Sequence, residues 1–225
     1  MKFFVVEGLD GSGKSTQIKL LQDYFTRKRI PYQYLHFPRT DTGVFGELIA
    51  RFLRGELGDI SQVDPYLVAL IYAGDRMDAS ETIKKWLSEG YTVLLDRYVY
   101  SNIAFQCAKT EIPSERKKLK EWIYHLEYDY FKIPKPDLSL FLDVPLSFTR
   151  QKLALNREGK DRSYLQGLKD IHEENMEFQK KVREVYLWEV SEEDNFMLIN
   201  CSDSQGKILP PQEIFSQILK NLGLT

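Results

Sequence analysis

The most informative stretch of this chain is a short glycine-rich segment near its N-terminus. Residues 7–16 read EGLDGSGKST, which completes the pattern G-x-x-x-x-G-K-[ST]. Glycines let the backbone curl around an anion with several N–H groups pointing inward, and a helix that starts there adds the positive end of its dipole. The lysine brings a mobile charge to the outer phosphates, and the final hydroxyl is a ligand for Mg²⁺. The segment predicts a phosphate-binding P-loop made of Gly8, Asp10, Gly11, Ser12, Gly13, Lys14, Ser15 and Thr16, with Ser15 as metal ligand and Lys14 as catalytic charge.

The flanks of this segment decide whether the pattern is meaningful. Residues 2–6 form an apolar run typical of a buried parallel strand, and residues 16–28 carry their apolar side chains on one helical stripe. The alternative is a glycine turn with a stray lysine. All fixed positions and both flanks are present, which favours the P-loop.

Two further predicted strands end in charged residues. The second strand is followed by Phe37-Pro38-Arg39 and the third by Asp96-Arg97-Tyr98. Ligands of parallel sheets bind beyond the carboxyl ends of the strands, so these side chains should join the P-loop at one edge. Asp96 is placed to orient Mg²⁺ through water, with a helix N-cap as the alternative. Arg39 and Arg97 suit a second phosphate group, with a surface ion pair as the alternative for either.

Arg76 lies in the middle of an apolar helical stretch, where a charge needs a partner or a cavity. Tyr72 lies one turn earlier on the same face. A flat ring beside a fork of donors would suit a planar base. A core tyrosine with an arginine paired to Asp75 or Asp78 is an equally good interpretation.

The chain as a whole has the size and composition of one α/β domain. It has 225 residues, is 43% hydrophobic and has a formal net charge of −2, which argues against a general nucleic-acid binder. The two cysteines and three histidines have no metal-ligand or disulfide-framework spacing. No run approaches membrane-spanning length and no signal peptide is visible, so we expect a cytoplasmic protein without membrane contact.

Strands and helices alternate along the sequence. Strands are expected at 2–6, 32–37, 91–95, 138–144 and 195–200, and helices at 16–28, 44–54, 64–88, 100–108, 114–131, from 145 to about 155, 170–188 and 211–222. Asp64 before Pro65 and Ser114 after Pro113 are the expected helix caps. This order predicts a three-layer α/β sandwich of the P-loop NTPase class. Its mainly parallel five-stranded sheet would be covered by helices on both faces and accompanied by a short lid segment.

These segments together resemble the thymidylate kinase family. The resemblance rests, in order, on residues 7–16, 37–39, 72–76 and 96–98, with Ser101-Asn102 and residues 134–137, and covers about the first two-thirds of the chain. It implies a nucleoside-monophosphate kinase fold spanning residues 1–225, phosphoryl transfer from ATP with Mg²⁺ to thymidine monophosphate, and a homodimer formed through packed helices.

The resemblance also implies roles for individual residues. Arg39 and Arg97 would hold the acceptor phosphate, with Ser101 nearby, and Asp10 would lie near the acceptor and the metal. Tyr72 would stack on thymine, where the family has a phenylalanine. Arg76 and Asn102 would bond the base, and Phe105 would lie against the deoxyribose.

Phosphoryl transfer also needs positive charge around the migrating group. One branch of the family carries an arginine inside the P-loop, but residues 9–12 here contain none. We therefore expect the lid, at about 156–169, to supply it through Arg157 or Arg162, with Tyr164 close to the substrate. A solvated charged loop is the alternative for this segment. Leu165 stands where many family members have an acidic residue, which leaves the alignment of the lid open.

Two other functions remain as alternatives. A deoxynucleoside kinase, or another nucleoside-monophosphate kinase, would share the P-loop and the lid, and the two arginines at strand ends favour a monophosphate acceptor. A non-catalytic nucleotide switch should carry a base-specificity motif such as N-K-x-D, and the chain has none.

Overall fold

A computed structural model of the chain describes residues 2–60, 62–154, 164–165 and 175–224. The elements are β1 (Lys2–Gly8), α1 (Lys14–Arg27), β2 (Tyr32–His36), α2 (Gly43–Leu53), α3 (Pro65–Ser88), β3 (Thr92–Asp96), α4 (Val99–Cys107), α5 (Pro113–Tyr124), the π-helix η1 (His125–Tyr130), β4 (Leu138–Asp143), α6 (Leu146–Ala154), α7 (Met176–Glu192), β5 (Phe196–Asn200) and α8 (Pro211–Asn221).

The strands form one five-stranded sheet in the order β2-β3-β1-β4-β5, and every pair in it is parallel. The predicted fold class is therefore confirmed. Central β1 is buried on both faces because its side chains alternate between two cores: Phe3 and Val5 join one cluster, and Phe4 and Val6 join the other. This explains why the strand is a continuous apolar run in the sequence.

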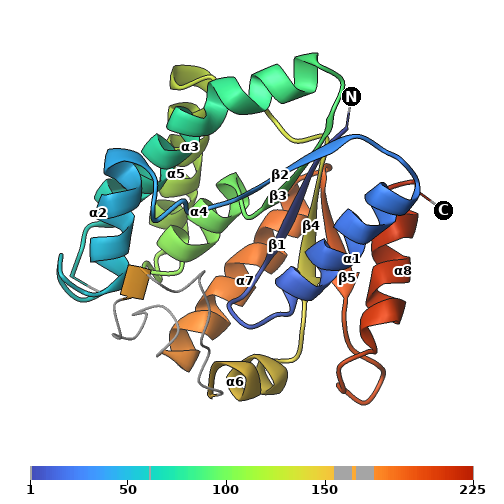
Figure 1. Cartoon of the computed structure of the whole chain (residues 1–225). Helices are drawn as coiled ribbons and strands as arrows, with labels where there is room; N and C mark the ends of the chain where they lie inside the picture. The colour runs from blue at the N-terminus through green and yellow to red at the C-terminus, as the bar shows by residue number, and fades with distance from the viewer. Residues whose placement is uncertain (1, 61, 155–163, 166–174, 225) are drawn as a thin grey trace.

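The helices cover both faces of the sheet (Figure 1). Helices α3, α4, α5 and α7 pack against the face that carries Phe3 and Val5, and α1 and α8 pack against the opposite face. A third cluster joins α2 to α3 through Ile49, Phe52, Leu53 and Val68. As a result, the carboxyl ends of β1, β2 and β3 lie side by side, with α2, α3 and α4 beside them.

Several predicted helix boundaries are wrong for local reasons. Ser114 is not a cap, because α5 already begins at Pro113 and its N-cap, Ile112, makes no side-chain cap bond. The predicted helix to Phe131 ends as α-helix at Tyr124 and continues as the π-helix η1. Helix α7 begins at Met176, where the Asn175 side chain accepts a hydrogen bond from Phe178 N at 3.0 Å.

The predicted cap of the long helix is confirmed. The Asp64 carboxylate accepts hydrogen bonds from the backbone N–H groups of Tyr66 and Leu67 at the start of α3. The helix then runs without a break to Ser88, although residues 74–76 look like an interruption in the sequence. Gly74 is required there because a Cβ would come within 2.3 Å of the Phe45 ring on α2.

Candidate active site

A cavity of about 730 Å³ opens at the carboxyl ends of β1, β2 and β3. This volume lies in the range of small-molecule sites, about 300–1,000 Å³. Sixteen of the residues expected to act in the site line it: Asp10, Gly11, Ser12, Gly13, Lys14, Ser15, Thr16, Arg39, Tyr72, Arg76, Asp96, Arg97, Ser101, Asn102, Phe105 and Tyr164. Gly8 completes the set through its carbonyl, which accepts a hydrogen bond from Lys14 Nζ. The structure therefore brings together every predicted site residue except Arg157 and Arg162, which lie outside the described residues.

The glycine-rich loop has the backbone shape that the pattern requires. Gly11 and Gly13 have φ of 76° and 83°, and α1 begins immediately afterwards at Lys14. Lys14 Nζ reaches back over the loop to the carbonyl oxygens of Leu9 and Gly8, at 2.9 and 3.3 Å. Burial lowers the pKa of Lys14 to about 8, and the charge of Arg97 acts in the same direction. The helix N-terminus and this ammonium form a positive site suited to phosphate oxygens.

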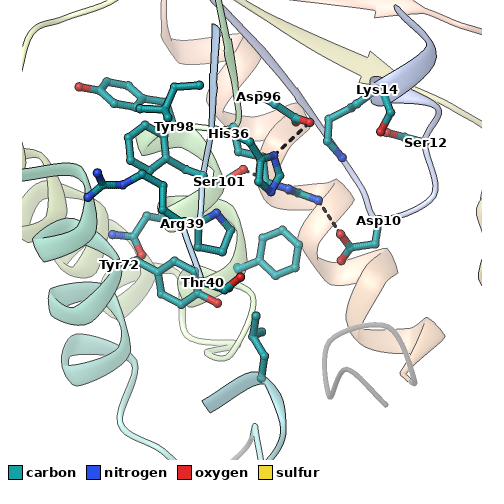
Figure 2. Close-up of a pocket in the computed structure, with 18 of the residues that line it drawn as sticks. Asp10, Ser12, Lys14, His36, Arg39, Thr40, Tyr72, Asp96, Tyr98 and Ser101 are labelled. Carbon is teal, nitrogen blue, oxygen red and sulfur yellow. Dashed lines mark hydrogen bonds and ion pairs between the residues drawn. The ribbon is translucent and has the colours of Figure 1, made fainter. Parts of the chain in front are cut away.

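Asp96 ends β3 beside the loop and is not a helix cap, because the N-cap of α4 is Tyr98. Its Oδ2 lies 3.2 Å from His36 Nδ1 (Figure 2). Burial alone would raise the pKa of Asp96, but His36, Lys14 and Arg97 hold it below the usual value. Its Oδ1 is buried and makes no hydrogen bond to the described residues.

The residues beside the glycine-rich loop fit a magnesium ion whose other ligands are the phosphates of a bound nucleotide. Mg²⁺ keeps several waters and takes only one or two protein ligands at such sites. The ionised carboxylate of Asp96 and the hydroxyl of Ser15 line the same cavity and supply such a set. In the described part of the chain, His, Cys, Asp and Glu side chains form no group of three or more that could hold a metal alone.

Arg97 connects the two halves of the cavity. Its backbone is in the left-handed region, with φ of 65°. Its Nη2 lies 2.6 Å from Asp10 Oδ1 on the loop, while Nη1 donates to Ser101 Oγ at 3.1 Å. The guanidinium carbon lies 5.2 Å from the centre of the Phe105 ring. Burial would lower the pKa of Arg97, but Asp10 and other acidic groups raise it overall, so the charge is permanent.

A buried glutamate, which the sequence did not single out, fixes this arginine. Glu7 is fully buried, and its carboxylate accepts hydrogen bonds from Tyr98 N at 2.8 Å, Ser101 N at 3.3 Å, Tyr186 Oη at 3.0 Å and Ser101 Oγ. Burial raises the pKa of Glu7. Tyr98 and Ser101, which follow Arg97 in the chain, are thereby tied to the end of β1. A polar residue at the end of an otherwise apolar strand is the signal in the sequence.

Arg39 is held by the α3 helix. Its Nε donates to Asp75 Oδ1 at 2.8 Å, and its Nη2 donates to the Asp75 carbonyl oxygen at 2.7 Å. The ion pair expected from the sequence as the alternative to phosphate binding is therefore present. It is partly buried, and Arg39 lines the cavity. Nη1 of Arg39 makes no hydrogen bond to the described residues and remains available to a ligand.

Arg76 has a partner that neither interpretation of the sequence named. Its Nε and Nη2 donate to Glu127 at 2.5 and 2.7 Å, whereas Asp75 pairs with Arg39. The prediction of Asp75 or Asp78 as its partner is wrong, because the π-helix η1 brings Glu127 into the core. Asn102 Nδ2 donates to the same glutamate and to Ala69 O, at 2.9 and 3.0 Å. The Asn102 side-chain oxygen is buried and makes no hydrogen bond to the described residues.

An aromatic wall completes this side of the cavity. Tyr72 packs edge-on against Phe52, with ring centres 6.5 Å apart. Figure 2 shows Tyr72 across the cavity from Lys14. Gln106, one turn beyond Asn102 on α4, also lines the cavity and is 1% exposed. Gln106 was not among the predicted site residues, although its spacing of four from Asn102 indicates the same helix face.

Part of the predicted site lies outside the described residues. Arg157 and Arg162 fall in 155–163, so the structure does not place them. Tyr164 is described, lines the cavity, and packs with the cluster that contains Phe52. Lys152 on α6 contributes a further positive charge to the cavity wall.

The sequence model of the family described as "Thymidylate kinase" matches residues 6–209. The chain belongs to the thymidylate kinase family. The thymidylate kinase of Plasmodium falciparum is 30% identical over 185 residues, which cover 82% of this chain and 75% of that protein. The probable thymidylate kinase of Pyrococcus horikoshii is 35% identical over 187 residues, covering 82% and 80%. That of Mycobacterium tuberculosis strain H37Rv, named thymidylate kinase, is 32% identical over 182 residues, covering 80% and 82%.

A solved thymidylate kinase structure from Candida albicans has the same fold. It superposes with a TM-score of 0.73 and 24% identity, over 99% of this chain and 91% of that one. As a member of the thymidylate kinase family, the chain is an ATP-dependent phosphotransferase. Among the residues that the structure describes, no helix combines the length and apolar character needed to cross a bilayer.

Proposed function

We propose that the protein transfers the γ-phosphoryl group of ATP to thymidine monophosphate, with Mg²⁺ bound to the ATP. The observation that carries the proposal is the joining of two sites in one cavity. The loop and Lys14 suit the phosphates of a donor, while Arg97, Arg39 and Tyr72 suit a second nucleotide with its own phosphate. The 2.6 Å contact between Asp10 and Arg97 supports this proposal, because it joins a residue of the loop to a residue of the acceptor side.

The acceptor side favours a monophosphate over a nucleoside. Arg97 brings a permanent positive charge, and Arg39 has a donor left over. Guanidinium groups bind phosphate in a bidentate manner, with charged hydrogen bonds stronger than neutral ones. An acceptor phosphate held there would present an oxygen to the γ-phosphorus in line with the bond to the leaving ADP oxygen.

The polar groups beside Tyr72 support thymine as the base. Tyr72 offers a ring for stacking, and Arg76 offers donors for an exocyclic oxygen. The amide nitrogen of Asn102 is already committed to Ala69 and Glu127, so its oxygen is the group that faces a base. A hydrogen-bond acceptor at this position matches the N3–H of thymine. The N3 of cytosine carries no hydrogen and cannot donate to it. Gln106 can complete the edge with either end of its amide.

We assign to Arg157 and Arg162 the positive charge that stabilises the migrating phosphoryl group, because residues 9–12 contain no arginine. Ser15 and Asp96 would hold Mg²⁺, which would supply further positive charge to the phosphate oxygens. The reacting groups would be oriented by three described residues of the cavity wall, Lys14, Asp10 and Arg97. Phe105, whose ring contacts the Arg97 guanidinium, is assigned to the acceptor's sugar, and Ser101, which accepts a hydrogen bond from Arg97, to its phosphate.

We further propose that residues 1–225 act as one kinase domain, in the cytoplasm and without nucleic acid, as a homodimer through packed helices. The exposed apolar residues of α3 support the dimer: Leu67 is 59% exposed and Leu70 40%. Sedimentation of the purified chain tests this, and a monomer at micromolar concentration would contradict it.

A coupled assay of ADP release tests the function. Wild-type protein should turn over ATP with thymidine monophosphate faster than with cytidine or guanosine monophosphate, and poorly with thymidine. Thymidine phosphorylated as well as its monophosphate would favour a deoxynucleoside kinase instead.

A further inference from the structure

The C-terminal end of α2 carries an arginine with two partners on different segments. Arg54 is the C-cap residue of α2, and its side chain is 10% exposed. Its Nε lies 2.5 Å from Glu56 Oε1, and its Nη1 donates to the main-chain oxygen of Tyr164 at 2.7 Å. The second contact joins residues 110 positions apart in the chain.

The partner, Tyr164, belongs to the wall of the acceptor side of the cavity. It packs with the cluster of Ile49, Phe52 and Leu53, the same cluster that supports Tyr72. Figure 1 shows residues 164–165 as a short orange piece beside the end of α2. Leu165 is 4% exposed, so this short piece is anchored by packing as well as by Arg54.

Arginine is well suited to such a two-way contact. Its guanidinium presents several donors in a rigid plane, so that one edge can bind a carboxylate while another binds a carbonyl. A hydrogen bond from an ionised donor is also stronger than a neutral one. Arg54 does not itself line the cavity, and its hydrogen bond to the Tyr164 main chain links it to a residue that does.

We propose that Arg54 is a positioning residue for the acceptor site: it holds the main chain of Tyr164 so that the tyrosine ring closes the wall beside Tyr72. The inference rests on the proposed function in one respect, that a nucleotide acceptor occupies this side of the cavity. Glu56 orients the guanidinium and is itself kept ionised, since hydrogen bonds from Arg54 and Arg51 lower its pKa.

Arg51 provides a matched control for Arg54. It binds the other oxygen of Glu56, with Nε 3.1 Å from Oε2, but it is 44% exposed and makes no hydrogen bond to Tyr164 among the described residues. Arg54→Met and Arg51→Met therefore remove the same charge and leave Glu56 with one arginine each. Only the first removes the contact with Tyr164.

The experiment is a comparison of steady-state constants for both substrates. Arg54→Met should raise the KM for the monophosphate by about tenfold, the effect of one charged hydrogen bond, and change the KM for ATP by less than about twofold. Arg51→Met should change neither. Arg54→Lys should lie between wild type and Arg54→Met, because an ammonium lacks the planar fork. Equal constants for Arg54→Met and Arg51→Met, with both proteins folded by circular dichroism, would overturn the proposal.

A double-mutant cycle tests whether the effect passes through the tyrosine ring. Tyr164→Ala keeps the main-chain oxygen but removes the ring, so adding Arg54→Met to it should change the KM for the monophosphate little further. A full second increase in that background would overturn the route through Tyr164. If wild-type protein prefers another monophosphate, thymine is the wrong base, and the same comparison with that acceptor still decides the role of Arg54.

Discussion

Arg97 Nη2 lies 2.6 Å from Asp10 Oδ1, so the arginine that follows β3 is bound to a carboxylate of the phosphate-binding loop. Both groups lie in the wall of one cavity. Asp10 also accepts a hydrogen bond from Gln179 on α7 at 3.1 Å. The donor and acceptor halves of the proposed site are therefore joined by a direct contact. Any change to this pair should alter the binding of one substrate and the rate together.

Arg97→Ala tests the acceptor half. Loss of charged hydrogen bonds to a phosphate costs about 1.5–3 kcal/mol each, so kcat/KM for the monophosphate should fall by about 10- to 150-fold. KM should rise and kcat should fall, because the arginine both binds and orients the acceptor. Steady-state kinetics against acceptor concentration measure both.

Arg183→Ala is the control for Arg97→Ala. Arg183 makes a comparable ion pair with Asp143 at the end of β4, at 2.6 Å, but does not line the cavity. It should leave the KM for the acceptor near the wild-type value. A similar loss in both variants would indicate a general effect of removing ion pairs.

Lys14→Met tests the donor half. Removing a cation aimed at developing charge costs about a hundredfold or more in kcat. The fold should persist, because the Lys14 bonds are confined to the loop carbonyls. Lys19→Met, which removes an exposed lysine one turn further along α1, should have normal turnover. Near-normal turnover of folded Lys14→Met would rule out the loop as the phosphate site.

A cluster on α5 and α7, outside the cavity, should make stability depend on pH. Glu189 is buried and lies 3.0 Å from Lys120, which also contacts Glu192 and Glu193. Burial raises the pKa of Glu189 to about 7 from an ordinary value of 4.5. Between these values the folded protein binds more protons than the unfolded chain, so the free energy of unfolding should fall as pH rises, by at most about 1.4 kcal/mol per pH unit.

Thermal unfolding from pH 5 to 7.5 measures this dependence. Glu189→Gln should flatten the fall in Tm over that range. Glu192→Gln is the control, because the hydrogen bond to Lys120 lowers the pKa of Glu192, which then titrates below the range. Equal slopes for Glu189→Gln and wild type would show that Glu189 is ionised throughout.

Arg157 and Arg162 should carry the charge that the loop lacks. Arginines that meet the transferred phosphoryl contribute about 10³–10⁵ in rate, so losing the acting one should lower kcat strongly with little change in ATP affinity. Single and double alanine variants, assayed for kcat and for ATP binding, identify it. A double variant that keeps more than about a tenth of wild-type kcat, a loss below 1.4 kcal/mol, would assign the charge elsewhere. Lys152 on the cavity wall would then be the next candidate.

The sequence predicted the sheet and the grouping of the site because both depend on local patterns. Buried parallel strands are apolar runs, and their ends are marked by Asp96, Arg97 and Arg39. In the structure β2 and β3 are neighbours and their last residues, His36 and Asp96, pair with each other, which brings the residues that follow them together.

The partners of these residues could not be predicted in this way. Glu127 is 51 positions from Arg76, and Glu7 is 94 from Ser101. Such pairs form only when helices pack, and here the π-helix η1 sets where Glu127 points. The start of α5 was misplaced for a local reason, because Pro113 already forms the first helical position and Ser114 lies inside the helix.

Transfer of labelled phosphoryl from ATP to thymidine monophosphate tests the central claim most directly. Protein incubated with Mg²⁺, γ-³²P-labelled ATP and thymidine monophosphate should place the label in thymidine diphosphate, with one ADP formed for each. Omitting the monophosphate should leave nearly all label in ATP. Label that appears only in inorganic phosphate would contradict the account. So would a parallel reaction with thymidine in which thymidine is labelled as efficiently as thymidine monophosphate.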